Sequence, residues 1–187
     1  KINVLLRVTS GNQFGLDESD IEMIIKNRES HPYINILGLQ CYTGTQKKKF
    51  DIIKNEIEWL DALCDRLYEE YGFKAEELEY GPGLPVDYFG DAAYENNYDM
   101  LKELAEMLSS YKEKYHITLE MGRYLAADCG VYVTGVADIK TNKGQQYVIV
   151  DGGINHVNYY GQTMAMKIPA YSYVKADGTI VRDKNIS

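Results

Sequence analysis

The chain alternates between short apolar runs and longer segments in which apolar residues recur every three or four positions. The apolar runs predict strands, and the periodic segments predict amphipathic helices. The predicted strands are Ile2–Val8, Ile34–Tyr42, 77–80 and 117–121, and the predicted helices span 17–30, 46–71 and 97–115. Because strands and helices alternate, we expect parallel strands joined by right-handed crossovers, in an open sheet or in part of a β/α barrel.

The pattern changes to β-rich segments after about residue 132. The stretch VYVTGVADIK-TNKG-QQYVIVD predicts a hairpin around an Asn/Gly turn. The later segment KIPAYSYVKADGTIVRD also favours strands and turns. We therefore predict two domains: a partial β/α barrel over residues 1–131 and the beginning of a β-domain over residues 132–187.

Composition narrows the class of protein. The 187 residues carry a net charge of −8, and the pI is about 4.9. An acidic surface disfavours nucleic acid and anionic membranes as partners. No run approaches the ~18 apolar residues of a membrane helix, and the N-terminal KINVLLRV is typical of a strand rather than a signal peptide. Three cysteines without metal-type spacing fit a reducing compartment, so we expect a cytoplasmic protein with no metal site.

The candidate chemistry lies where the predicted strands end, because parallel α/β proteins place function at the carboxyl ends of their strands. Each end also has a plain structural interpretation: a salt-bridged arginine, a polar turn with Thr45 or Gln46 as the cap of the following helix, a common Gly-Pro turn, or an internal Glu–Arg pair. Taken together, the ends favour a phosphorylated cofactor held by backbone N–H groups, hydroxyls and an arginine. They carry, in order, Arg7; Gln40, Tyr42, Thr43, Thr45 and Gln46; Gly81 and Gly83; and Glu120 and Arg123.

The lysines at 47–49 are not expected to take part in this chemistry. Lys47, Lys48 and Lys49 form a charge run at the start of a predicted helix. Such a run is typical of a solvated face, so the three lysines are expected to be exposed to solvent.

Five segments, in this order, resemble fold-type III pyridoxal-phosphate decarboxylases, the group that contains diaminopimelate and ornithine decarboxylases. They are VLLRV with QFGLDE, GLQCYTGTQ, LEYGPGLP, LEMGRYLAADCGVYVTGV and YVIVDGGINH, from about Val4 to His156. The resemblance implies the C-terminal half of an alanine-racemase-like (β/α)8 barrel, followed by the first strands of a β-domain. The family's Schiff-base lysine would precede Lys1 and its catalytic cysteine would follow Ser187, so the resemblance implies an inactive fragment of a longer enzyme.

The resemblance also implies roles for individual residues. Glu120 would be the catalytic glutamate that contacts the pyridine nitrogen of pyridoxal 5'-phosphate and keeps the ring an electron sink. Arg123 would lie on the phosphate side of the cofactor. Tyr42 replaces the family's stacking histidine and keeps an aromatic face. The full set of candidate cofactor-binding residues is Arg7, Tyr42, Thr45, Gly81, Gly83, Glu120 and Arg123, in which the two glycines offer backbone and Thr45 a hydroxyl to the phosphate.

Some positions depart from the family's pattern. Pro82 stands at the middle glycine of the glycine loop, and Met121 stands at the proline of the Glu-Pro-Gly-Arg motif. No Arg-Pro-x-Leu-Tyr segment follows DGGINH, which argues against diaminopimelate as the substrate. The segments TGTQK and DGGINHVNYYGQ are instead similar to the branch that decarboxylates amino acids tethered to carrier proteins.

The resemblance therefore implies the activity of a carboxy-lyase. The α-carboxylate of a small-molecule or carrier-protein-tethered amino acid would be lost through an external aldimine, in a homodimer. One alternative is a non-catalytic homologue that binds pyridoxal phosphate or a partner protein, which Tyr42, Pro82 and Met121 motivate. The other is an amino-acid racemase, which Glu120 disfavours because racemases of this barrel generally use Arg at the pyridine nitrogen.

Overall fold

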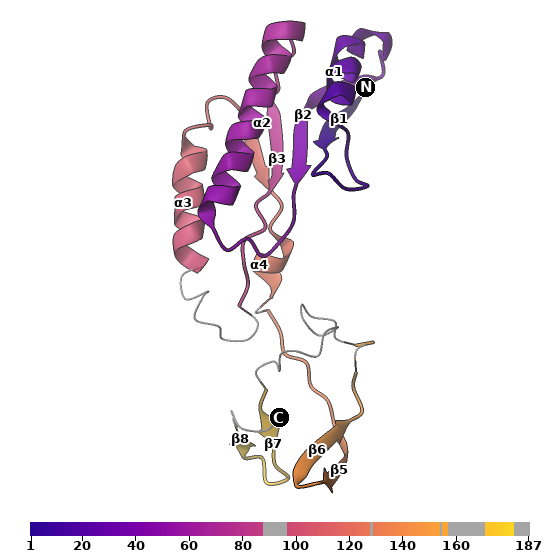
Figure 1. Ribbon diagram of the computed structural model, residues 1–187, viewed down its shortest axis with the longest axis vertical. Coiled ribbons are helices and arrows are strands. Elements are labelled where there is room, and N and C mark those ends of the chain that lie inside the picture. The colour runs from indigo at the N-terminus through magenta and orange to yellow at the C-terminus, as the bar shows by residue number, and fades with distance from the viewer. Residues whose placement is uncertain (88–96, 128, 154, 157–170, 182–187) are drawn as a thin grey trace. The chain divides into compact units, whose positions relative to one another are not determined.

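The computed structural model describes residues 1–87, 97–127, 129–153, 155–156 and 171–181. They fall into two compact units, Lys1–Val86 with Tyr94–Ala126 and Asp87–Ala93 with Ala127–Ser187. The elements of the first unit are β1 (Ile2–Val8), α1 (Glu18–Lys26), a 3-10 turn η1 (Arg28–Ser30), β2 (Ile34–Tyr42), α2 (Phe50–Tyr71), β3 (Glu77–Gly81), α3 (Asn97–Ser109), β4 (His116–Leu119) and α4 (Gly122–Ala126) (Figure 1).

The first unit is built on a parallel sheet with strand order β1-β2-β3-β4. In Figure 1, α2 and α3 lie side by side across one face of this sheet. The side chains on that face, among them Leu39, Cys41, Leu78 and Tyr80, are buried beneath the helices. The predicted α/β fold with parallel strands is confirmed. Because the strands are parallel, their carboxyl ends lie at the same end of the sheet.

The helix α2 packs through the apolar stripe that its spacing predicts. Its buried residues are Ile53, Ile57, Leu60, Leu63, Cys64 and Leu67. The helix ends at Gly72, which adopts a left-handed φ of 60° and donates its N–H to the Tyr68 carbonyl. The predicted start at Gln46 is wrong, because Gln46 itself has a φ of 60° and the helix begins at Phe50. The expectation that Thr45 or Gln46 caps α2 is also wrong, since Lys49 holds the cap position.

Three other predicted boundaries differ from the structure. The segment predicted as one helix over 17–30 is divided, because α1 ends at Lys26 and η1 follows. The helix predicted to reach Tyr115 ends at Ser109, where short-range backbone hydrogen bonds begin a chain of turns. The last strand of the sheet ends at Leu119 rather than residue 121, and the short helix α4 was not predicted.

Two antiparallel strand pairs are found among the described residues of the second unit. β5 (Val136–Asn142) and β6 (Gln145–Val150) form the predicted hairpin. Its turn places Lys143 and Gly144 at φ values of 52° and 83°, as a tight hairpin turn requires. β7 (Tyr173–Val174) pairs with β8 (Ile180–Val181). The expected strands and the motif NYYGQ within 157–170 lie outside the described residues, and a β-domain that begins at residue 132 stays a prediction.

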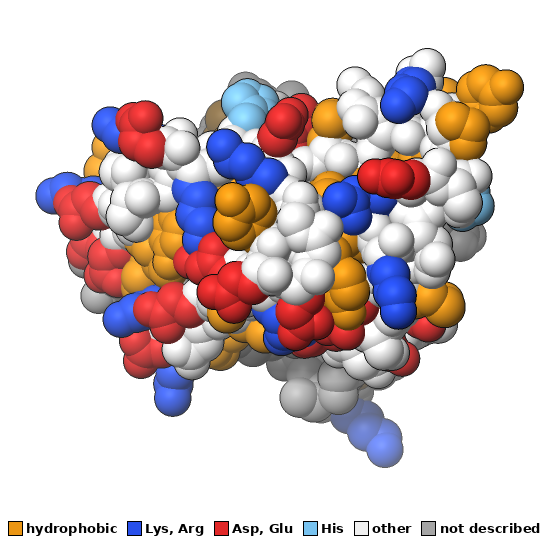
Figure 2. All heavy atoms as spheres, turned by 90° about the horizontal axis from the view of Figure 1, so that it is seen from above, with side chains coloured by type: hydrophobic (Ala, Val, Ile, Leu, Met, Phe, Trp, Pro, Cys, Tyr) orange, Lys and Arg blue, Asp and Glu red, His pale blue; other side chains and the backbone are white. Residues whose placement is uncertain are grey.

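Charged side chains on the surface are mixed in sign despite the net charge of −8. Figure 2 shows acidic and basic groups interspersed over one face, with hydrophobic groups between them. Ion pairs in the first unit join Arg66 of α2 to Glu18 and Glu22 of α1, and Lys114 in the turns after α3 to Asp61 and Asp65 of α2. Within the part of the chain that the structure describes, no helix has the length and apolar character needed to span a membrane.

Candidate cofactor site

A cavity of about 350 Å³ lies in the first unit, at the carboxyl ends of its strands. It is lined by Tyr42, Thr45, Gly83, Leu84, Glu120, Met121, Gly122, Arg123 and Tyr124. The structure thus brings together five of the seven residues expected at the site. Gly81 and Arg7 do not line this cavity.

The lining residues come from strand ends, from the turns that follow them and from α4. Tyr42 closes β2, Thr45 belongs to the turn between β2 and α2, and Gly83 lies in the turn after β3. Glu120 directly follows β4, and its N–H donates to the Tyr80 carbonyl at 2.9 Å. This hydrogen bond continues the pairing of β3 with β4 by one residue, so Glu120 lies at the carboxyl end of the sheet.

Gly81 at the end of β3 and Gly83 in the turn after it both lie where a side chain would clash with a neighbouring segment. A side chain at Gly81 would place its Cβ 2.6 Å from Cδ2 of Tyr42, so Gly81 makes room for the Tyr42 ring. Gly83 has a φ of +63°, and a Cβ there would lie 2.1 Å from the Gly44 carbonyl oxygen. The turn after β2 and the turn after β3 are therefore in contact, and both border the cavity.

A polar row crosses the face of the sheet that α2 and α3 leave open. Arg7, Gln40 and Glu79 are neighbours in register on β1, β2 and β3, so their side chains share this face. Gln40 donates its Nε2 to Oε2 of Glu120 at 3.0 Å, which links the row to the cavity. Its other amide atom, Oε1, is buried and has no hydrogen-bond partner among the described residues.

Arg7 is held by an aromatic ring rather than by a carboxylate. Its guanidinium lies 5.3 Å from the centre of the Phe14 ring. Among the described residues no acidic group is within ion-pair distance of Arg7. The interpretation of Arg7 as a salt-bridged residue is therefore wrong among the described residues. The role of Arg7 in cofactor binding stays a prediction.

Glu79 belongs to the site and was missed from the sequence. The hydrogen bond between its carboxyl group and Glu120 raises the pKa of Glu79, and burial raises it further. A second carboxyl group nearby raises the pKa because two adjacent negative charges repel each other. The signal in the sequence was the alternation of ELEY, which puts Glu79 on the face of the sheet opposite the buried Leu78 and Tyr80.

Glu79→Gln is expected to raise the free energy of unfolding at neutral pH. A carboxyl group whose folded pKa is raised binds its proton more tightly in the folded state, so stability falls as pH rises from about 4.3 through the raised pKa. The amide of glutamine resembles the protonated carboxyl group, so the variant does not lose this stability as pH rises. Urea unfolding across a pH series measures the effect, with the exposed Glu69→Gln as the matched control. If the stability of Glu79→Gln and of the wild type changed with pH in the same way, the pKa of Glu79 would not be raised in the folded protein.

The buried thiols of the first unit do not add chemistry to the cavity. Burial raises the pKa of both Cys41 and Cys64 to about 11, so neither supplies a thiolate near neutral pH. Both are on the helix-covered side of the sheet. In the described ranges, no group of three His, Cys, Asp or Glu side chains is arranged to hold a metal ion.

Lys47 was expected on a solvated face, and this expectation is wrong. Its side chain is only 7% exposed and its Nζ lies 2.6 Å from Oε2 of Glu56 on α2. The other two lysines of the run, Lys48 and Lys49, are exposed as expected. Lys47 can be buried because the carboxylate of Glu56 on α2 pairs with its ammonium group. This pairing cannot be read from the sequence around Lys47.

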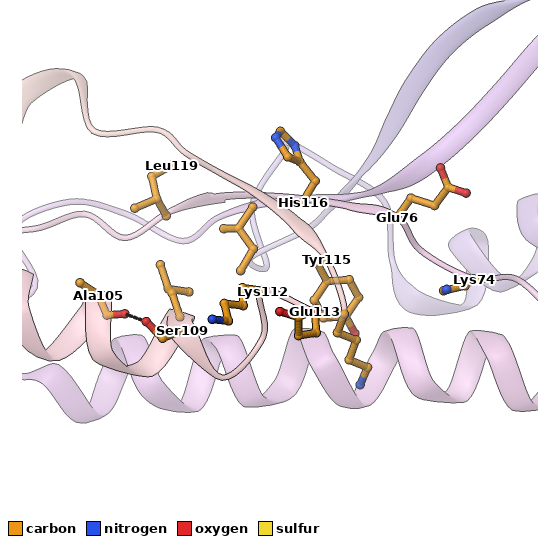
Figure 3. Close-up of a pocket in the computed structure, with 12 residues that line it drawn as sticks. Lys74, Glu76, Ala105, Ser109, Lys112, Glu113, Tyr115, His116 and Leu119 are labelled. Atoms are coloured by element: carbon orange, nitrogen blue, oxygen red, sulfur yellow. Dashed lines mark hydrogen bonds between the residues drawn. The ribbon is translucent and has the colours of Figure 1, made fainter.

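A larger hollow of about 750 Å³ lies beside β4, near the connection from α3. Figure 3 shows that His116 points away from α3, while Ser109 donates to the Ala105 carbonyl within the helix. The lining mixes acidic and basic groups, including Glu76, Lys112 and Glu113. Glu76 and His116 lie where β3 and β4 begin, which is the end of a parallel sheet that rarely carries catalytic groups.

Comparison with known proteins assigns the chain to a family. A model of the pyridoxal binding domain of pyridoxal-dependent decarboxylases matches residues 6–127. This match covers more than half of the chain, and the chain belongs to the family of pyridoxal-dependent decarboxylases. The recognition made from the five sequence segments is confirmed.

Known relatives agree with this assignment. An L-glutamyl-[BtrI acyl-carrier protein] decarboxylase of Niallia circulans is 33% identical over 168 residues, which cover 84% of this chain and 38% of the relative. A diaminopimelate decarboxylase of Haemophilus influenzae is 29% identical, over 94% of this chain and 40% of the relative. The crystal structure of diaminopimelate decarboxylase from M. jannaschii matches with a TM-score of 0.75 and 27% identity, over 93% of this chain and 44% of that one. The chain thus spans about two fifths of the length of these relatives.

The residues around the cavity fit pyridoxal phosphate. A carboxylate (Glu120), a hydroxyl (Thr45), an aromatic ring (Tyr42) and a guanidinium (Arg123) all line one cavity. A Cβ at Gly83 would fill the space between the two turns. The buried Oε1 of half-buried Gln40 has no hydrogen-bond partner among the described residues and is a further polar atom on this side of the sheet.

Proposed function

We propose that the protein is a pyridoxal-phosphate-dependent decarboxylase, which removes the α-carboxylate of an amino acid. The observation that carries the proposal is the convergence of Glu120, Thr45, Gly83, Arg123 and Tyr42 on one cavity. Membership of the pyridoxal-dependent decarboxylase family supports it. When bound, pyridoxal phosphate supplies the electron sink that accepts the charge left by the departing CO₂.

Glu120 is the proposed catalytic residue of this chain. Its carboxylate would hold a proton on the pyridine nitrogen, because an adjacent anion favours the protonated form. The Nε2 of Gln40 donates to Oε2 of Glu120 at 3.0 Å, which orients the carboxylate. Glu79 lies beside Glu120, and the hydrogen bond between them raises the pKa of Glu79.

The remaining residues are proposed to bind and orient the cofactor. The hydroxyl of Thr45, the backbone around Gly83 and Gly81, and the guanidinium of Arg123 would bind its phosphate. The Tyr42 ring, which rests against Gly81, would stack on the pyridine ring. For Arg7 we propose a role on the open face of the sheet, because it is the register partner of Gln40.

For the substrate we propose an amino acid tethered to a carrier protein. The 33% identical relative acts on a glutamyl group attached to an acyl-carrier protein, and it supports this class over a free amino acid such as diaminopimelate. We further propose a cytoplasmic homodimer in which a barrel over residues 1–131 is followed by a β-domain. The free thiols of Cys41, Cys64 and Cys129 support the reducing compartment.

The decisive experiment incubates the full-length protein with pyridoxal phosphate and measures bound-cofactor absorbance together with CO₂ release from free and carrier-linked amino acids. We expect cofactor binding and faster CO₂ release from a carrier-linked substrate. Cofactor binding without CO₂ release would favour a non-catalytic homologue, which Tyr42, Pro82 and Met121 motivate. Change in the chirality of the amino acid without CO₂ release would identify a racemase, and absence of cofactor binding would overturn the proposal.

A further inference from the structure

The carboxylate of Glu56 gathers hydrogen-bond donors from two other parts of the first unit. Its Oε1 accepts from the Thr43 hydroxyl at 2.5 Å, and its Oε2 accepts from Nζ of Lys47 at 2.6 Å. The hydroxyl of Tyr80 on β3 donates to the same Oε2. Glu56 is 15% exposed and Lys47 is 7% exposed. One largely buried carboxylate on α2 therefore links the turn after β2 and the strand β3 to the helix.

The turn after β2, which Glu56 contacts, is also hydrogen-bonded to the segment that follows β3. The N–H of Lys47 donates to the Gly83 carbonyl at 3.0 Å. The side chain of Gln46 makes two reciprocal hydrogen bonds with the backbone of Val86, at 3.0 and 2.6 Å. Thr45 lies between these attachments and lines the cavity. The turn 43–47 is thus fixed by groups on both sides of the residue that faces the cofactor site.

This network is poorly explained as a source of folding stability. A buried ion pair loses about as much free energy in desolvation as it gains in attraction. A fully hydrogen-bonded polar network instead selects one conformation, because every alternative leaves buried groups unpaired. Tyr80 remains a hydrogen-bond donor at neutral pH, since burial and the neighbouring Glu56 raise its pKa.

We propose that Glu56 is a positioning residue for the phosphate of the cofactor, an inference that rests on the proposed function. Glu56 holds Thr43 and Lys47, and through them it places the Thr45 hydroxyl beside Gly83 before any ligand binds. A preformed turn loses little conformational freedom when the phosphate arrives. Loss of Glu56 leaves the turn to be ordered by the ligand, which weakens binding of the phosphate group and leaves contacts to the pyridine ring intact.

The test compares the affinity of the full-length protein for pyridoxal phosphate and for pyridoxal, which lacks the phosphate. Glu56→Gln is expected to weaken pyridoxal phosphate about tenfold, the effect of about 1.4 kcal/mol, and to change pyridoxal less than about twofold. The ratio of the dissociation constant of pyridoxal to that of pyridoxal phosphate therefore falls. The matched control is Glu58→Gln, which removes a carboxylate of α2 that is 51% exposed, and its ratio should equal that of the wild type.

Two further variants separate positioning from folding. Lys47→Met combined with Glu56→Gln removes both buried charges, so it should unfold at higher urea concentration than Glu56→Gln and yet keep the lowered ratio. Recovery of the wild-type ratio in this double variant would overturn the inference, as would an unchanged ratio in soluble, folded Glu56→Gln. Thr43→Val, which removes one donor without changing shape, should lower the ratio in the same direction, and it carries the test if Glu56→Gln does not fold. A wild type that does not prefer pyridoxal phosphate to pyridoxal would refute the proposed function itself.

Discussion

Replacing Glu120 by Gln is expected to lower kcat for CO₂ release on the order of 100-fold, the usual cost of losing one preorganised electrostatic group. Glutamine keeps the size of the side chain and the hydrogen bond from Gln40. It carries no negative charge, so it no longer favours a proton on the pyridine nitrogen. Binding of the cofactor phosphate should change little, because the turns that bear Thr45 and Gly83 are untouched.

Steady-state kinetics and cofactor titration of Glu120→Gln measure these two effects separately. The control is Glu103→Gln, at an exposed position of α3, which should leave kcat and cofactor affinity at their wild-type values. If kcat of Glu120→Gln stays within about threefold of the wild type, a difference of less than 1 kcal/mol, Glu120 is not the partner of the ring nitrogen.

Gly83→Ala is expected to destabilise the fold and to weaken binding of pyridoxal phosphate. Its φ of +63° costs a non-glycine residue about 1–2 kcal/mol. The added Cβ would lie 2.1 Å from the Gly44 carbonyl oxygen, and relief of such an overlap costs about a further 1–3 kcal/mol. Because the backbone must move, the two turns separate, and cofactor affinity should fall by an order of magnitude or more.

Urea unfolding and cofactor titration check both expectations for Gly83→Ala. Gly122→Ala is the control for stability: a Cβ at Gly122 meets nothing within 4 Å, and this residue opens the short helix α4. The unfolding midpoint of the control should match that of the wild type. Equal stability of Gly83→Ala and Gly122→Ala would show that the turn accommodates a side chain, contrary to the geometry described above.

The strands and the body of α2 were predictable because their signal is local. Residues such as Ile53, Ile57 and Leu60 repeat at the period of a helix, and they are buried as this period requires. The start of α2 was not predictable in this way. Gln46 departs from helical geometry with hydrogen bonds to Val86, 40 positions away in the sequence. Helix ends that depend on distant partners carry no periodic signal.

The candidate site divides along the same line. Glu120, Tyr42 and Thr45 could be found because they end strands or follow them, and the fold brings such ends together. Glu56 and Lys47 could not, because their pairing depends on how the turn after β2 folds back against α2. A glutamate beside the apolar stripe of a helix is ordinary in sequence, and only the burial of its partner distinguishes it.

The hydrogen bonds between Gln46 and Val86 also bear on how relatives of this protein can be recombined. They join the two ends of a segment that contains α2, β3 and both turns of the cavity. A chimera whose junction falls inside α2 would take these two residues, and also Lys47 and its contact with Gly83, from different parents. Junctions placed before Thr43 and after Val86 transfer the whole cassette, so domain-shuffling libraries built on those borders should retain more folded, cofactor-binding members.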